Sequence, residues 1–170
     1  LWLLVNLGTA ILASLVISQF GATLEQMIAL AVLMPIVASM GGNAGTQTLT
    51  ITVRSLATKE LTAFNAFRTI RKEFLVGILN GVLFAIIIGI VAMFWFQDQE
   101  PSRNLLLGAV IAAAMVINMI VAGVAGVIVP LAFERMRIDP AIASSVFVTT
   151  VTDVVGFFAF LSLASWILFT

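Results

Sequence analysis

Long apolar stretches separated by short polar segments make up most of the chain. A bilayer core about 30 Å thick is crossed by roughly 20 helical residues, and five stretches qualify. The second contains Pro35 and several glycines, so we expect its helix to be interrupted there. Asp139 followed by Pro140 is typical of a helix start, with Asp as N-cap and Pro at the first helical position. The predicted spans are residues 1–20, 27–52, 74–96, 105–133 and 140–169.

The distribution of basic residues indicates which side of the membrane each predicted loop faces. The first loop contains no Lys or Arg, and the third contains only Arg103. Cytoplasmic loops are enriched in Lys and Arg, so the second and fourth loops are predicted to be cytoplasmic. The fold class is therefore all-α, a polytopic membrane protein with five transmembrane helices, its N-terminus cytoplasmic and its C-terminus outside. The basic residues of the second and fourth loops are Arg54, Lys59, Arg68, Arg71, Lys72, Arg135 and Arg137.

Apolar side chains recur at roughly every third position beside the basic residues that precede the third span. This spacing is typical of a helix lying in the membrane interface, and a simple basic loop that anchors to lipid explains it equally well. Either interpretation makes membrane lipid a partner. The apolar residues are Leu61, Phe64, Phe67, Ile70 and Phe74.

Composition restricts the class of protein further. Hydrophobic residues make up 62% of the chain and charged residues 9%, against about 45–50% and about 25% in soluble domains. A soluble domain, a nucleic-acid binder and a disordered tail are thereby excluded, and a net charge of zero gives no field that would attract a polyanion. The chain has no Cys and no His, which excludes disulfides, thiolate zinc sites and His-based catalytic triads.

The chain begins at Leu1 inside an apolar stretch, with no basic segment or cleavage site before it. This start is unlike a signal peptide, so we expect a piece of a longer protein. Residues 1–170 are expected to form a single transmembrane domain in the cell's inner (plasma) membrane, which the chain crosses several times.

Asp153 is the one charged residue predicted to lie deep in the membrane. It follows Pro140 by thirteen residues, or about 20 Å of helix, which is near the middle of the bilayer. Ser145, Thr149 and Asp153 share one helix face. Acids at this depth are costly and mark ion pathways, and no Lys or Arg lies at similar depth to neutralise this one. The alternative is a hydrogen bond that joins two helices.

The second unusual element is the polar and glycine-rich part of the second span. Asn43 and Gln47 are amides at helical spacing, and Asn43 lies about 14 Å from the end of the span, a depth similar to that of Asp153. Glycines here allow close backbone approach or local unwinding beside a water-filled path, although tight helix packing also explains them. The predicted path-lining residues are Gly41, Gly42, Asn43, Gln47 and Ser145.

Small residues elsewhere indicate helix packing without function. Gly77 and Gly81 form a G-x-x-x-G pair in the third span, and Ala122 with Gly126 forms a similar pair in the fourth. Asn118 is a possible contributor to the path, but a hydrogen bond between helices is the better interpretation.

The candidate residues fit cation binding better than catalysis. A lone intramembrane acid without His cannot supply a nucleophile with its base or a pair of acids, so the chain is predicted not to be an enzyme and to have no catalytic residues. Carboxylate, hydroxyl and amide oxygens are ligands for hard cations such as Mg²⁺, which keeps several of its waters. One Asp per chain suits a hydrated ion, and two copies of Asp153 across a two-fold axis balance one divalent charge.

The segment from Pro35 to Gln47 resembles the P-x5-G-G-N-x-G-x-Q signature of the MgtE family of magnesium channels, and the segment from Asp139 to Asp153 resembles that family's last span. The resemblance covers essentially the whole chain. It implies the pore domain of a homodimeric channel that conducts hydrated Mg²⁺ into the cytoplasm. It also implies that Asp153 is the acidic pore ligand, that the Thr149 carbonyl is a second ligand, and that cytoplasmic sensing domains precede the pore in the full-length chain. Ser145 stands where family members often have Gly.

Two other functions remain open at this point. One is a secondary transporter coupled to protons or Na⁺, although five spans do not divide into two equal repeats. The other is a non-conducting membrane anchor, which has no need of an unpaired acid in the bilayer.

Overall fold

The computed structural model describes residues 2–62, 64–95 and 101–169, and these residues contain six α-helices and no strand. The prediction of an all-α membrane protein agrees with four long apolar helices that could cross a bilayer, α3 to α6. The first helix has 17 residues and is shorter than these four. The helices are α1 (Trp2–Ser18), α2 (Gly21–Gln26), α3 (Ile28–Ala57), α4 (Ala66–Trp95), α5 (Pro101–Arg135) and α6 (Pro140–Phe169).

The helices extend beyond several of the predicted spans. The predicted first loop contains the short helix α2, and α4 begins eight residues before the predicted start at residue 74. Phe67, Ile70 and Phe74 therefore lie in the first turns of α4, so these three residues form neither a separate interfacial helix nor a loop. Residues 1 and 96, at the ends of two predicted spans, and residues 97–100 of the predicted third loop lie outside the described residues.

The predicted interruption of the second span is wrong, because α3 is one continuous helix. Pro35 lies inside it and removes one backbone hydrogen bond. Gly41 and Gly45 are buried, and their missing side chains let neighbouring helices approach closely enough to offset the low helix propensity of glycine. Close approach, and not unwinding, is what the glycines provide.

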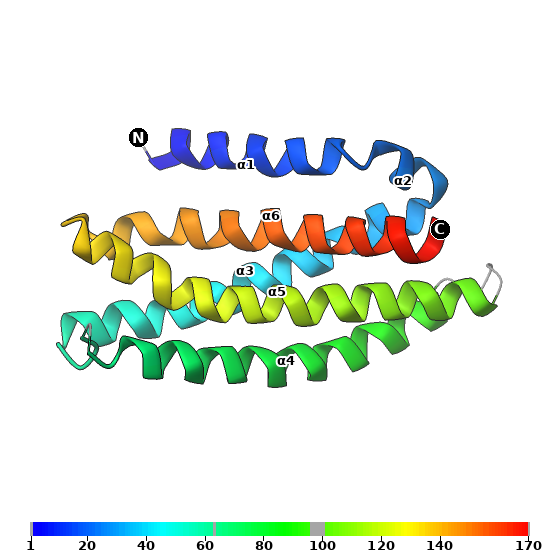
Figure 1. Cartoon of the computed structure of the whole chain (residues 1–170). Coiled ribbons are helices and arrows are strands. Elements are labelled where there is room, and N and C mark those ends of the chain that lie inside the picture. Colours follow the sequence, from blue (N-terminus) through cyan, green and yellow to red (C-terminus); the bar gives the residue numbers. More distant parts are fainter. Residues whose placement is uncertain (1, 63, 96–100, 170) are drawn as a thin grey trace.

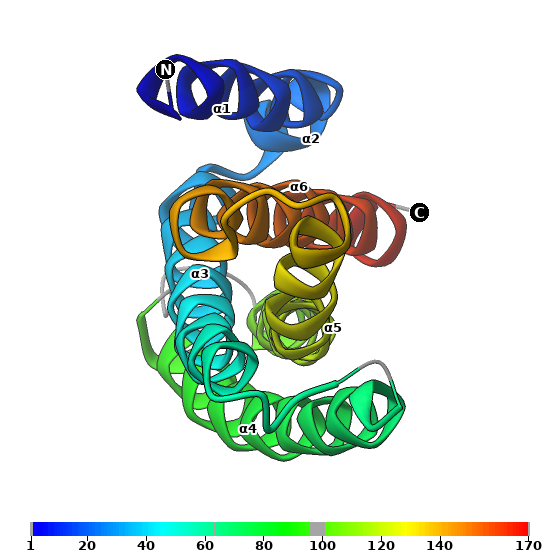
Figure 2. The same ribbon diagram turned by 90° about the vertical axis from the view of Figure 1, so that its left-hand side faces the viewer.

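The central element of the bundle is α5, which packs against α3, α4 and α6. Figure 2, viewed along the bundle, shows α3, α6 and α4 placed around α5, with α1 and α2 lying outside α6. Helix α1 packs mainly against α6. The fully buried side chains of α5 include Leu107, Ile111, Met115 and Asn118. The core is therefore built around a helix with few polar side chains.

Both small-residue pairs pack as predicted. A Cβ atom added to Gly77 would lie 2.8 Å from the Met119 carbonyl oxygen of α5, and one added to Gly81 would lie 2.9 Å from the Val116 Cα of α5. In the second pair, a Cβ atom on Gly126 would lie 2.8 Å from the Gly45 carbonyl oxygen of α3. These backbone contacts hold α4 and α3 directly against α5.

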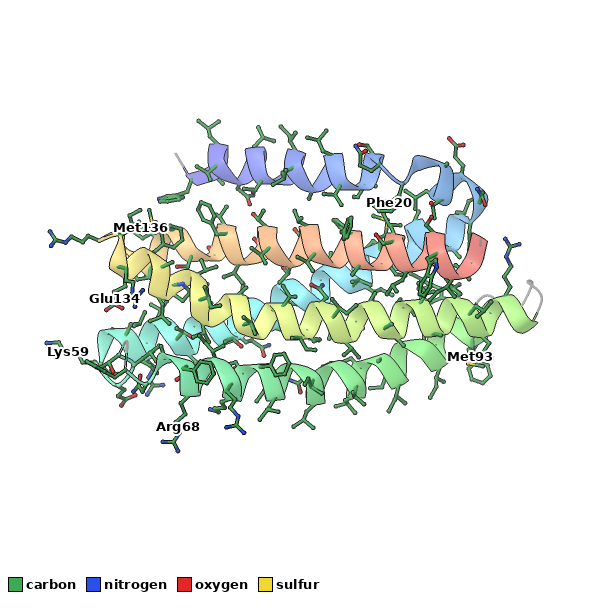
Figure 3. The ribbon with its side chains drawn as sticks, viewed as in Figure 1. Phe20, Lys59, Arg68, Met93, Glu134 and Met136 are labelled. Carbon is green, nitrogen blue, oxygen red and sulfur yellow. The ribbon has the colours of Figure 1, made fainter. Side chains whose placement is uncertain are left out.

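The loops with most basic residues lie at one end of the bundle. Figure 1 shows the α3–α4 and α5–α6 connections at the same end as the N-terminus, with the C-terminus at the opposite end. Lys59, Arg68 and Glu134 mark this end in Figure 3. The predicted N-cap is confirmed there, because the Ala141 backbone N–H donates to the Asp139 Oδ1 over 2.9 Å and Pro140 is the first helical residue.

Candidate ion path beside α3 and α6

A row of polar residues on α3 is left uncovered by the rest of the chain. The row begins at Ser39, continues through Asn43, Gln47 and Thr50, and ends at Arg54, and all five residues are exposed. Their spacing of three or four residues places them on one face of α3, along about 22 Å of helix. We call this row the polar face of α3. The polar face is the half of α3 nearer the α3–α4 connection.

Helix α6 borders the polar face through Gly42. A Cβ atom on Gly42 would lie 3.9 Å from the Thr149 Cγ2, and one on Gly45 would lie 2.6 Å from the Val148 Cγ1. These contacts fix the register of the two antiparallel helices. Because the two helices are antiparallel and Asp153 lies one turn beyond Thr149, this register places Asp153 about one turn from Gly42 toward the start of α3, at the Ser39 end of the polar face.

The Asp153 side chain is partly buried and has no hydrogen-bond or ion-pair partner among the residues that the structure describes. No group of three or more acidic residues gathers there that could hold a metal, within the same described ranges. At Asp153 the described residues of a single chain therefore offer one carboxylate without a partner, and not a closed metal cage. An ion held at Asp153 needs its own waters, or a second chain, to complete its ligand shell.

The threonine hydroxyls near the polar face donate to carbonyl groups of their own helices. Thr46 donates to the Gly42 carbonyl over 2.9 Å, and Thr149 to the Ser145 carbonyl over 3.0 Å. Each hydroxyl has one hydrogen, so its remaining function is to accept. These threonines thus present acceptor oxygens, which suit the water molecules of a hydrated cation. The predicted ligand, the Thr149 carbonyl oxygen, already accepts the Thr152 hydroxyl over 2.9 Å.

The other predicted path residues do not share one environment. Gly41 is buried, and an added Cβ atom there would collide with the Asn118 amide of α5, so Gly41 faces the bundle interior. Ser145 and Thr149 line a groove of about 320 Å³ between α6 and the start of α1. Gln47 lies at the edge of the polar face and lines a pocket of about 260 Å³ between α3, α4 and α5. Gly42 faces Thr149 of α6, and Asn43 belongs to the polar face of α3.

Sequence reasoning did not single out Glu73, which lies in the same pocket as Gln47. Its Oε2 accepts the Thr48 hydroxyl over 3.1 Å, and its carboxylate is partly buried. Because Arg71 and Lys72 precede it, the sequence analysis assigned it to a basic loop. The apolar residues that follow Ala66 at helical spacing were the only signal that α4 starts early enough to include it.

Asn118 joins two helices, as the preferred interpretation of the sequence held. Its Nδ2 donates to the Val37 carbonyl oxygen of α3 over 2.8 Å, and the side chain is fully buried. Its Oδ1 is also buried and has no hydrogen-bond partner among the residues that the structure describes.

Comparison with known proteins assigns the chain to a family. The family model for MgtE, described as a divalent cation transporter, matches residues 34–163. The chain is 33% identical over 164 residues to the magnesium transporter MgtE of Bacillus subtilis, covering 96% of this chain and 35% of the relative. The MgtE of Enterococcus faecalis is 34% identical over the same shares, and that of Thermus thermophilus is 32% identical over 98% and 36%. The chain therefore spans about a third of the length of these relatives.

The matched region contains α4 and α5 and most of α3 and α6, together with the polar face of α3 and Asp153. The relatives are named as magnesium transporters, which agrees with the prediction that the chain is not an enzyme. The resemblance inferred from Pro35 to Gln47 is thereby confirmed, and the chain belongs to the MgtE family of divalent cation transporters.

Proposed function

We propose that the chain is the pore domain of a Mg²⁺ channel and conducts hydrated Mg²⁺ into the cytoplasm. The observation that carries the proposal is the polar face of α3, which is uncovered in a helix long and apolar enough to span a membrane. Lipid cannot hydrogen-bond to exposed amides and hydroxyls, so such a face must meet water or protein. A hydrated path along it satisfies this requirement.

Asp153 is the proposed charged ligand of the path. It lies at the end of the polar face farther from Arg54, one helical turn beyond Thr149, which faces Gly42, and its carboxylate is unpaired among the described residues. A hydrated Mg²⁺ is held there by waters that bridge to Asp153, Asn43 and the Thr149 carbonyl. The names of the relatives, magnesium transporters, support Mg²⁺ as the substrate.

The proposed assembly is a homodimer with the path on its two-fold axis. One chain offers a single deep carboxylate, whereas two copies of Asp153 balance the charge of one divalent ion. The polar face of α3 is exposed in the single chain, and a second copy facing it would enclose a water-filled path on both sides. Lipid covers the remaining apolar surfaces.

The proposed membrane is the plasma membrane, with the N-terminus cytoplasmic and the C-terminus outside. The basic connections lie at the same end of the bundle as the N-terminus (Figure 1), as the positive-inside rule requires for this orientation. Helix α1 is the proposed fifth span, because its 17 residues extend about 25 Å. A membrane potential of 100 mV drives a divalent ion inward by about 4.6 kcal/mol without any coupled ion.

Flux of Mg²⁺ into liposomes tests the proposal. We expect the purified chain to conduct Mg²⁺ down its gradient, with no dependence on a proton or Na⁺ gradient. The Asp153→Asn variant keeps the oxygen and the size but loses the charge, so its preference for Mg²⁺ over K⁺ should fall. Dependence on a second ion gradient would instead indicate a coupled transporter, and absence of flux from the well-folded chain would indicate an anchor.

Cysteine cross-linking tests the dimer, because the chain has no native Cys. A Thr50→Cys variant places the thiol on the polar face, and a bifunctional maleimide should join two chains there. The matched Leu83→Cys variant places it on the exposed face of α4, where no cross-link is expected. A conducting monomer would contradict the two-fold path.

A further inference from the structure

The amide of Asn118 lies between the two helices that border the proposed path. On one side it donates from Nδ2 to the Val37 carbonyl oxygen of α3 over 2.8 Å. On the other side a Cβ atom added to Gly156 of α6 would lie 2.7 Å from the same Nδ2 and 3.0 Å from Cγ. Gly41 of α3 meets the same amide. A side chain from the central helix thus fills the space between α3 and α6 where both are glycine.

This contact is at the level of the proposed ion ligand. Gly156 lies three residues from Asp153 on α6, and Gly41 directly precedes Gly42, which faces Thr149. Any change in the separation of α3 and α6 at Asn118 therefore changes the separation of Asp153 from the polar face of α3. A hydrated ion bridges the two helices through waters, so its binding depends on that separation.

Packing alone explains the position of Asn118 poorly. The side chain is fully buried, and its Oδ1 has no partner within the described part of the chain. Leaving this oxygen unpaired costs about 1–3 kcal/mol relative to an apolar residue of the same shape. An apolar side chain would fill the same space without this cost, but it could not donate to Val37. The hydrogen bond to α3 gives the amide one fixed orientation, and so one fixed thickness between the two helix backbones.

We propose that Asn118 is a positioning residue of the ion path, which sets the separation of α3 and α6 at the level of Asp153. This inference rests on the proposed function, since it assigns Asn118 a role in conduction without contact with the ion. It predicts that a smaller residue at position 118 brings α3 and α6 closer together and that a larger residue at position 156 moves them apart.

The variants are chosen in compensating pairs. Asn118→Ala removes the spacer and should let α3 and α6 approach, whereas Gly156→Ala adds a methyl group against the amide and should separate them. The double variant Asn118→Ala with Gly156→Ala removes the clash and should restore much of the original separation. Asn118→Thr is close to Asn in size but cannot reach Val37, so it tests the hydrogen bond and serves if Asn118→Ala does not fold.

A matched control carries the same steric change at a different interface. Gly77→Ala places a methyl group 2.8 Å from the Met119 carbonyl oxygen, on the neighbouring residue of α5 but toward α4. It should lower the thermal stability of the protein without changing the α3–α6 separation or the ion selectivity.

Two measurements are made on each variant in liposomes. Double electron–electron resonance between nitroxide labels on the Val32→Cys and Phe158→Cys positions of one chain measures the distance between α3 and α6. Labelled chains are diluted with unlabelled protein so that distances between chains do not contribute. Both positions are exposed in the single chain. Mg²⁺ and K⁺ flux per folded protein gives the selectivity.

We expect the distance to shorten in Asn118→Ala and to lengthen in Gly156→Ala, with Mg²⁺ selectivity lowered about tenfold in both and partly restored in the double variant. Unchanged distances would overturn the proposal, and so would changed distances with unchanged selectivity. If the unsubstituted protein conducts no Mg²⁺, the proposed function is wrong, and Asn118 has no role in conduction. The measured distances still show whether Asn118 separates α3 and α6.

Discussion

Helices α3 and α4 make an instructive comparison, because they have the same length and both pack against α5. Each contains 30 residues, and each leaves one face uncovered by the chain. The uncovered face of α4 is apolar, with Leu79 exposed to 71% and Leu83 to 54%. The uncovered face of α3 carries the amide side chains of Asn43 and Gln47. The two faces therefore differ in chemistry and not in exposure.

The difference indicates the surroundings that each face requires. A lipid environment satisfies the aliphatic face of α4, but it leaves amide and hydroxyl groups without hydrogen bonds. The contrast is limited to one half of α3, because Ile28 and Val32 at its other end are exposed and apolar. Only the half of α3 nearer the α3–α4 connection therefore requires water or protein beside it.

The largest effect is expected from removing the one deep carboxylate beside the polar face. A divalent ion 4 Å from a carboxylate gains about 2 kcal/mol in water, so loss of two carboxylates per dimer should lower Mg²⁺ flux at least about a hundredfold. Mg²⁺ flux into liposomes measures this loss in Asp153→Ala. The control Asp139→Ala removes a helix N-cap and should cost about 1 kcal/mol of stability with flux per folded protein unchanged. Full activity of a well-folded Asp153→Ala would exclude Asp153 from the path.

Filling the space between α3 and α6 should have the next largest effect. The Gly42 position has room for a methyl group, since an added Cβ atom meets only Thr149, at 3.9 Å. Gly42→Ala should therefore stay active, whereas Gly42→Leu should lower flux by about tenfold by narrowing the path.

The counterpart on α4 is Val82→Leu, which places a larger side chain on an exposed face. This variant should change neither the yield of folded dimer nor the Mg²⁺ flux. Size-exclusion chromatography and flux together decide the result. A packing role for Gly42 would instead reduce the yield of folded dimer, with normal flux in what remains.

Exchanging amide and aliphatic residues between the two faces should give a smaller effect. Asn43→Ala removes a dipole but no net charge, so we expect flux to fall by about three- to tenfold, less than for Asp153→Ala. Leu83→Asn places an amide on the α4 face, where it should reduce membrane insertion while leaving the flux per inserted protein unchanged. Equal flux losses in both variants would remove the distinction between the two faces.

The smallest effect is expected from Glu73, which belongs to α4 but faces the pocket beside Gln47. Glu73→Gln keeps an acceptor for the Thr48 hydroxyl and removes one charge. Because water screens a charge outside the path, Mg²⁺ flux should fall less than about threefold. The control is Glu134→Gln, an exposed residue at the same end of the bundle (Figure 3). A loss of tenfold or more with Glu73→Gln alone would place this pocket in the conduction path.

Much of the fold was predictable because apolar length is a local property. The four long helices and the cap at Asp139 followed from runs of apolar residues and from short-range helix signals. The continuity of α3 was not predictable, since glycine and proline lower helix propensity locally while the contacts that offset this come from α5 and α6. The start of α4 was misplaced because its first turns carry Arg68, Arg71 and Lys72, which read as a loop.

The candidate site was predictable in part for a similar reason. Asp153 and Asn43 were identified by depth alone, since polar residues in a long apolar stretch need a specific explanation. Only the structure shows which of these residues lie on the same side of the bundle. Gly41 and Gly42 are adjacent in the sequence, yet one faces the Asn118 amide and the other faces Thr149.

The sequence by itself determined that this chain is a bundle of membrane helices with a deep acid and a polar, glycine-rich segment, because burial in lipid acts on each helix separately through its length and composition. The tertiary structure decided which face of α3 stays uncovered, how Asp153 is aligned with it, and that Asn118 and Glu73 lie beside them. These features depend on the register and separation of helices distant in the chain, which are set by side-chain and backbone contacts that no single segment contains.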